Sequence, residues 1–344
     1  MDAFISDAFT LFKRGGNRAI SVNPPDDYIG VHITTRGSDW LWSAMSLFGA
    51  LTVLNFAVYL FSVRSASKRI TFLIPFINNL IMAITYFTYA SNLGYTGIAT
   101  EWTGHTKADD GKWVRQIFYA KFVGWFLCWP GLLLLFEIDT TTFRPSRDFF
   151  DNVVHFLSKF WGKLLCAWVW TIGLLIGALI RSTYKWGYFT FAVVGQLTCL
   201  ALVAGSLFSS MGYSFEAGAK ARWSLLLLLW ALAWLTQTIN WGLSEGSNRI
   251  QPDSEAVWSG VVDLINFGLI PTVLAFVLSF GSSESLLAKF KGPYDNYYEE
   301  KVVVDTPRAS GDTAVAGESA NADGEILAAE GADVNETTAR QRAV

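Results

Sequence analysis

Seven long apolar segments, separated by shorter polar stretches, constrain the fold of this chain more than any other feature of its sequence. They cover residues 41–63, 70–90, 117–136, 164–180, 188–208, 225–243 and 257–280. A helix needs about 20 apolar residues to cross the hydrocarbon core of a bilayer, with a range of roughly 17 to 25. We therefore predict an all-α membrane protein built as a bundle of seven transmembrane helices.

The composition excludes most other classes of protein. Of the 344 residues 52% are hydrophobic and only 16% are charged, and the mean hydropathy is +0.33. A soluble domain rarely carries so much apolar surface. The formal net charge is -3 and no basic patch is present, so nucleic acid is not an expected partner, whereas membrane lipid is.

Nothing in the sequence indicates an enzyme or a metal site. His32, His105 and His155 lie far apart and have no ligand spacing around them. There is no glycine-rich phosphate loop and no nucleophile elbow. The three cysteines all fall inside apolar segments, where packed thiols are more common than a disulfide framework. We expect no catalytic residue and no bound metal.

The composition also divides the chain into three parts. Residues 1–38 form a polar tail without the apolar core of a signal peptide, residues 39–291 form the membrane domain, and residues 292–344 form a second tail. The second tail has almost no clusters of large aliphatic residues. It cannot bury enough apolar surface to offset the entropy cost of ordering, so we expect it to be disordered.

The last apolar segment carries the most specific sequence. It reads Val262-Asp-Leu-Ile-Asn-Phe267 and follows the stretch from Trp241 to Ala256. This region closely resembles the part of fungal opsins, members of the microbial rhodopsin family, that joins their sixth and seventh helices. In pigment-forming members a lysine four residues after the aspartate forms the Schiff base to retinal. Here Phe267 stands at that position, and because a phenyl ring has no amine, covalently bound retinal is not expected.

The third apolar segment is similar to the third helix of the same family. There a basic residue is followed by an acidic proton acceptor, a tryptophan, a proline and a proton-donor carboxylate. The matching positions hold Lys121, Gly124, Trp125, Pro130 and Leu135. The resemblance therefore implies that both proton-handling carboxylates of a pump are missing.

The sixth segment retains part of the family's chromophore cage. Trp234 and Trp241 match the two tryptophans that sandwich retinal, and Gln237 and Thr238 replace the tyrosine and proline between them. One interpretation is a residual pocket for an apolar ligand such as a sterol or fatty acid. Its candidate residues are Trp125, Trp234, Gln237, Trp241, Asp263 and Phe267. The alternative, which we favour, is that the aromatic rings fill this space themselves.

Ionisable residues inside membrane helices usually face a partner or a cavity. Lys121 and Asp263 lie on helices that face each other in the opsin fold, so we predict an interior ion pair between them, direct or through one water. Glu245 and Glu255 match the family's proton-release carboxylates in position. At a solvated rim we expect them to be ordinary surface acids.

The orientation rests on charge together with the resemblance. Basic residues concentrate in the cytoplasmic loops of membrane proteins, and the clearest basic cluster here is the turn with Arg64, Lys68 and Arg69. With the opsin resemblance, this favours an amino terminus outside the cell, a cytoplasmic carboxyl tail, and a short extracellular hairpin or loop between the second and third helices.

Three functions from different classes compete. The first is a retinal-free, opsin-related protein of the fungal plasma membrane, non-catalytic and associated with stress. The family's small heat-shock members suggest the proton-pumping ATPase or stress machinery as partner, or a chaperone-like role, and a homo-oligomer is compatible with it. The second is a light-driven pump or photosensor, against which Phe267, Gly124 and Leu135 argue together. The third is a small-molecule transporter, for which an internal repeat is expected and not seen.

Overall fold

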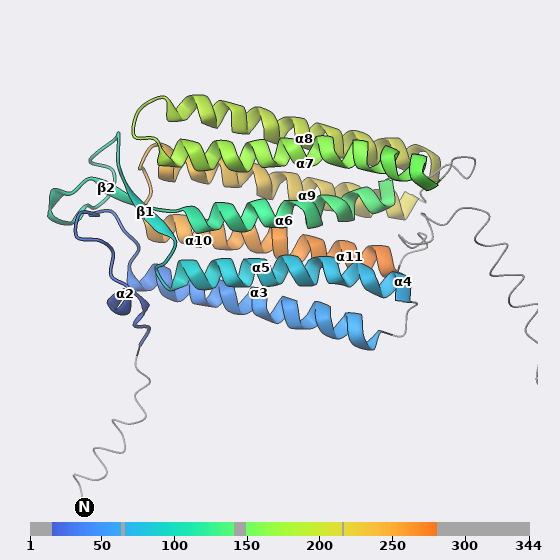
Figure 1. Cartoon of the computed structure of the whole chain (residues 1–344), viewed down its shortest axis with the longest axis horizontal. Helices are drawn as coiled ribbons and strands as arrows, with labels where there is room; N and C mark the ends of the chain where they lie inside the picture. The colour runs from blue at the N-terminus through green and yellow to red at the C-terminus, as the bar shows by residue number, and fades with distance from the viewer. Residues whose placement is uncertain (1–15, 63–65, 141–148, 215–216, 281–344) are drawn as a thin grey trace, which may run out of the picture. The chain divides into compact units, whose positions relative to one another are not determined.

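A computed structural model describes residues 16–62, 66–140, 149–214 and 217–280 of the chain. Within this part, seven helical spans are long and apolar enough to cross a membrane, which confirms the predicted bundle. They lie side by side in Figure 1. They are α3 (Thr35–Phe61), η1 and α5 (Ile70–Phe72 and Leu73–Ala90), α6 (Tyr119–Thr140), α7 (Phe149–Leu179), α8 (Lys185–Ser214), α9 (Ala217–Trp241), and α10, η4 and α11 (Pro252–Asp263, Leu264–Leu269 and Ile270–Phe280).

Most of these spans begin earlier than the apolar runs predicted. The fourth, α7, starts at Phe149 and not near residue 164. Its first turns are amphipathic: Phe156 is buried, while Asp151 and Lys159 carry charge. A search for continuous apolar residues misses such a turn, because only one of its faces is apolar.

An antiparallel hairpin connects α5 to α6, as predicted. Its strands are β1 (Tyr95–Ala99) and β2 (Val114–Phe118), and Tyr95 pairs with Phe118. The short 3-10 turn η2 (Asp109–Gly111) lies between them. At the entry to β1, Gly94 has a φ of 68°, a left-handed conformation that glycine adopts without the strain of a Cβ atom. We call this side of the molecule the hairpin end of the bundle.

The segment before α3 packs against the hairpin. It contains the short helix α2 (Ala19–Val22), and Val31 forms a parallel bridge with Arg115 of β2. Ile29, Val31 and Ile33 are buried. The predicted polar tail of residues 1–38 thus includes an apolar stretch, and α3 begins before the predicted boundary at residue 39. Residues 63–65, the last residues of the predicted membrane domain (281–291) and the predicted tail (292–344) lie outside the described residues.

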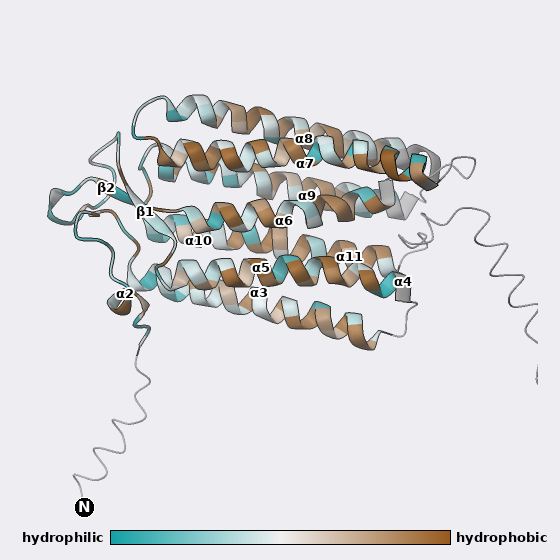
Figure 2. Ribbon diagram, viewed as in Figure 1, coloured by the Kyte–Doolittle hydropathy of each residue, from teal (hydrophilic) through white to brown (hydrophobic). Residues whose placement is uncertain are grey.

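The bundle buries its middle and exposes apolar residues outward, as expected for lipid surroundings. The third span, α6, is the most buried of the seven, and α3 is the least. Large apolar side chains such as Val53, Phe61 and Phe191 are exposed. Figure 2 shows hydrophobic residues along the helices and hydrophilic residues gathered toward the hairpin. All three cysteines are free; Cys128 and Cys199 are buried, as predicted for packed thiols, whereas Cys166 is partly exposed.

Candidate functional site

Four charged side chains meet inside the hairpin end of the bundle. Lys121, in the first turn of α6, forms ion pairs with both Glu245 and Glu255. Arg115, on strand β2, pairs with Glu255 at an Nη2–Oε2 distance of 2.6 Å. All four residues are at most 5% exposed. We call these residues the charge cluster; its two positive and two negative charges balance.

The predicted direct ion pair between Lys121 and Asp263 is wrong, because Lys121 takes these two glutamates as its partners. Helical side chains lean toward the amino end of their helix. The amino end of α6 is at the hairpin end, so the Lys121 ammonium points there. Asp263 lies eight residues beyond Glu255 on the seventh span, about 12 Å farther along the helix axis.

The expectation that Glu245 and Glu255 are surface acids is also wrong. Glu245 lies in the π-helical turn η3 (Gly242–Gly246), which carries its side chain inward. The Ser244 hydroxyl donates to its carboxylate. The connection then turns through Asn248, with a φ of 50°, and Arg115 fixes this turn by donating to Asn248 Oδ1 and to the Ile250 carbonyl, both at 2.8 Å.

Asp263 has neutral hydrogen-bond donors as its partners in place of Lys121. Its Oδ2 accepts a hydrogen bond from the Tyr86 hydroxyl at 2.8 Å and another from Trp125 Nε1 at 2.9 Å. The side chain is 1% exposed. These donors, on α5 and α6, hold the carboxylate against the interior face of the seventh span.

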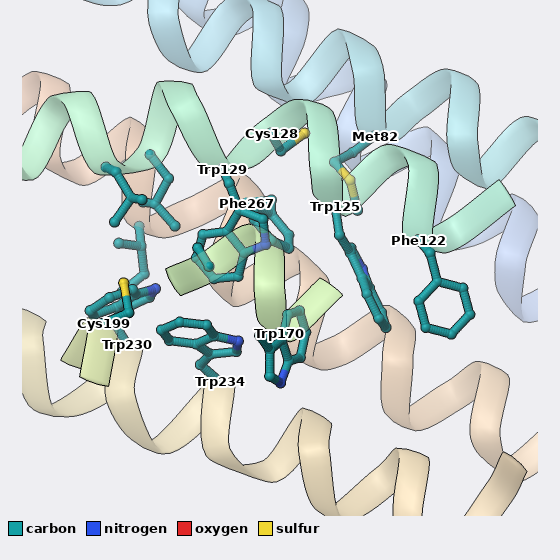
Figure 3. Packing of buried hydrophobic residues seen from close by; sticks show 14 of the residues in the cluster. Met82, Phe122, Trp125, Cys128, Trp129, Trp170, Cys199, Trp230, Trp234 and Phe267 are labelled. Atoms are coloured by element: carbon teal, nitrogen blue, oxygen red, sulfur yellow. The ribbon is translucent and has the colours of Figure 1, made fainter. Parts of the chain in front are cut away.

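Deeper in the bundle, five large rings form a continuous aromatic cluster. The Trp129 ring lies 4.4 Å from that of Trp234 and 5.2 Å from that of Phe267, centroid to centroid. Trp170 and Trp230 contact Trp234 at 5.5 and 5.3 Å. All five are buried, and Figure 3 shows the rings gathered between the helices. The favoured prediction of aromatic rings packing one another in this region agrees with these contacts.

The six candidate pocket residues fall into separate groups of contacts. Trp234 and Phe267 belong to the aromatic cluster, and Trp125 touches its edge through Trp170, at 5.2 Å. Trp241 points elsewhere: it stacks on Phe189 at 5.3 Å and donates to the Leu174 carbonyl. Gln237 donates to Ser259 of α10, whereas Asp263 accepts from Tyr86 of α5 and Trp125 of α6.

The positions of the missing proton carriers are occupied by close packing. A Cβ atom at Gly124 would lie 2.4 Å from Thr85 Oγ1, so any larger residue there requires this side chain to move. Leu135 is fully buried in the core. Within the described residues, no group of His, Cys, Asp and Glu side chains is arranged to hold a metal ion.

Several interior residues were missed by the sequence reasoning. Arg115 lies outside the predicted apolar segments, and Trp129 and Trp170 were not singled out. Glu137 and Lys163 form a second buried ion pair toward the opposite end of the bundle, where Lys163 also donates to Ser206. Lys163 was missed because it lies just before the predicted fourth segment, residues 164–180.

Comparisons with known proteins agree with this architecture. No family model matches the chain. It is 35% identical over 324 residues to the 30 kDa heat shock protein of Saccharomyces cerevisiae, covering 87% of this chain and 92% of that protein. It is also 35% identical over 257 residues to the opsin-like protein carO of Fusarium fujikuroi, covering 72% of this chain and 76% of the other.

Among solved structures the chain is similar to microbial rhodopsins. The light-driven proton pump of Leptosphaeria maculans aligns with a TM-score of 0.61 at 18% identity, covering 76% of this chain and all of the pump. Halorhodopsin, a light-driven chloride pump, aligns with a TM-score of 0.58 at 17% identity, covering 71% of this chain and 95% of that protein. At such identities the likeness concerns the fold alone.

Proposed function

Because the chain belongs to the fungal family of opsin-like proteins and 30 kDa heat shock proteins, we propose that it works without retinal, as a non-catalytic membrane protein of the stress response. The observation that carries this proposal is Phe267. It stands at the position that matches the retinal-binding lysine of pigment-forming opsins. Its side chain is 1% exposed and packs edge-on against Trp129.

The surrounding residues do not fit a covalently bound retinal. Phe267 offers no amine to form the Schiff base. The Trp129 ring, in contact with both Phe267 and Trp234, brings a bulky side chain between the matched position on the seventh span and the matched tryptophan on the sixth. A light-driven pump also needs a proton acceptor, and Gly124 has no side chain that could serve.

The proposed location is the plasma membrane, with the amino terminus and the hairpin outside the cell and the carboxyl tail in the cytoplasm. Two observations support this orientation: the basic residues Lys68 and Arg69 lie in α4 (Ala66–Arg69), at the end opposite the hairpin, and basic residues favour the cytoplasmic side. The name of the yeast relative, a heat shock protein, supports the link to stress.

In this proposal the protein acts by binding another protein at the membrane. The proton-pumping ATPase is the partner that the family association favours, with associated stress proteins or a chaperone-like role as the alternative. A chain with balanced buried charges and a closely packed aromatic interior is suited to a stable scaffold. Its outward apolar faces and its carboxyl tail offer surfaces for contact.

An absorption spectrum tests the absence of retinal. Purified protein is incubated with all-trans retinal and scanned beside a pigment-forming opsin treated in the same way. We expect the opsin to develop a visible band and this protein to show none. A visible band that hydroxylamine bleaches would contradict the proposal, because it reports a Schiff base.

Proton efflux tests the partner. The gene is deleted in its host, the cells are stressed by heat, weak acid or ethanol, and ATPase-dependent efflux is measured. We expect efflux to change in the deletion and to be restored by the full chain. Unchanged efflux would reject the ATPase as partner.

A chain ending at Lys291 locates the contact surface. Full rescue of efflux by this truncated chain would place the contact on the bundle, and no rescue would place it on the tail.

A further inference from the structure

Beside the charge cluster lies a second set of buried polar side chains that the proposed function does not use. It consists of Gln237 and Asn240 on α9 with Ser259 and Asp263 on α10, each at most 2% exposed. We call it the polar seam.

Three side-chain oxygen atoms of the polar seam have no hydrogen-bond partner among the described residues. Gln237 Nε2 and Asn240 Nδ2 both donate to Ser259 Oγ, at 3.3 and 2.9 Å. Their amide oxygens are thereby turned away from that hydroxyl. Among the described residues, Gln237 Oε1, Asn240 Oδ1 and Asp263 Oδ1 are buried and have no hydrogen-bond partner.

These oxygens belong to adjoining turns of two antiparallel helices. Helix α9 ends at the hairpin end and α10 begins there (Figure 1). Gln237 therefore lies about one turn farther from the hairpin than Asn240, and Asp263 lies about one turn farther from it than Ser259. Both asparagine and glutamine meet α10 at Ser259. The two amides and the Asp263 carboxylate thus lie within about one helical turn of Ser259.

Among the described residues, no cation lies within ion-pair distance of the buried Asp263 carboxylate. The charge cluster is neutral within itself, Lys185 donates to the Glu245 and Gly246 carbonyls, and the hydrogen bonds to Asp263 come from the neutral Tyr86 and Trp125. A buried carboxylate without a cation is costly. Each unsatisfied acceptor beside it adds to that cost. In the polar seam every unsatisfied buried atom is an acceptor.

We propose that the polar seam binds one monovalent alkali cation. Hard cations take oxygen ligands from carboxylates and amide carbonyls, which are the groups that Asp263, Gln237 and Asn240 supply through their unsatisfied oxygens. Ser259 Oγ already accepts from both amides and holds them in place. A single carboxylate balances a single positive charge, which favours a monovalent over a divalent ion. This site is separate from the partner binding proposed above. It uses neither histidine nor cysteine, and the lack of suitably spaced ligands of these types was the reason for expecting no bound metal.

Equilibrium binding of radioactive Na⁺ to the full-length protein in detergent tests the site. The buffer holds choline chloride as its only other salt. We expect about one Na⁺ per chain at saturation, displaced by unlabelled Na⁺ or K⁺ and not by choline. No saturable binding to the unmodified protein would overturn the proposal.

Two variants and a matched control locate the binding. Asp263→Asn keeps the shape and removes the charge, so we expect at least a tenfold loss of affinity. Gln237→Met removes one oxygen at similar volume and should weaken binding several-fold, which keeps the test decisive if Asp263→Asn fails to fold. Glu137→Gln removes a buried carboxylate at the opposite end and should bind Na⁺ as the unmodified protein does. Equal binding by all three variants would overturn the site.

Discussion

Glu255 is the residue on which the charge cluster depends most, because it pairs with both cations. We predict that Glu255→Gln strongly destabilises the bundle. Glutamine keeps the shape of the side chain and its capacity to hydrogen-bond, but it leaves Arg115 and Lys121 with one carboxylate, Glu245, between them. The change therefore creates one uncompensated positive charge in a region at most 5% exposed.

The expected magnitude follows from two opposing terms. At an effective dielectric constant of about 20, opposite charges about 3 Å apart attract by about 5 to 6 kcal/mol, and Glu255 makes two such contacts. Glutamine avoids the desolvation of a buried carboxylate, which offsets several kcal/mol of that attraction. Breaking a buried pair by removing one partner costs about 3 to 5 kcal/mol in net terms, and we expect a loss in this range.

Unfolding by sodium dodecyl sulfate in mixed micelles, followed by circular dichroism, measures the free energy of unfolding. The double variant Glu255→Gln with Arg115→Gln provides the decisive comparison, since it leaves a neutral Lys121–Glu245 pair and should recover at least half of the loss. Asp110→Asn, in an exposed ion pair with Lys112, should cost almost nothing. A loss below about 1 kcal/mol in Glu255→Gln, or a double variant no more stable than the single one, would refute the reasoning.

Three further variants probe the interior. Phe267→Lys should give no light-driven acidification of a vesicle suspension containing retinal, because Gly124 leaves no proton acceptor; acidification by this single variant would show that the third helix is wrongly aligned. Trp129→Ala should lower the free energy of unfolding by about 3 to 5 kcal/mol, since it removes the ring that joins Trp234 to Phe267, and a loss under about 1 kcal/mol in the same detergent titration would mean that the cluster is loosely packed. Tyr86→Phe should cost about 1.5 to 3 kcal/mol through the lost hydrogen bond to a carboxylate, and unchanged stability would argue against that bond.

The spans could be predicted from sequence because length and hydropathy decide which segments cross a bilayer. Their ends could not, because charged or amphipathic turns such as those at Phe149 and Lys185 extend beyond the apolar core. The hairpin between α5 and α6 was expected from the resemblance. Its role was not, since no local pattern shows that Arg115 on one strand reaches the last helix.

The partners of Lys121 could have been chosen better from helix geometry alone. The residue lies three positions into α6, and a long side chain there leans back toward the start of the helix. The nearest acids in that direction are Glu245 and Glu255, and Asp263 lies two turns deeper. Sequence reasoning identified the residues that carry charge but paired them by position in the family, without the direction of each side chain.

The aromatic interior was predicted in part. Trp125, Trp234 and Phe267 were named from the resemblance, and they are buried as expected. Trp129, which directly precedes Pro130, was not among the predicted residues. In the structure Trp129 contacts rings on three other spans, those of Trp170, Trp234 and Phe267.

The charge cluster also constrains the order in which the bundle can assemble. Arg115 and Lys121 enter with the hairpin and the third span, whereas their acceptors follow 124 to 140 residues later in the chain. Until the sixth and seventh spans arrive, both cations lack the carboxylates that allow them to leave water. Contacts so distant in sequence form slowly, so the hairpin end should remain open and hydrated during insertion and close only when the last helix is in place.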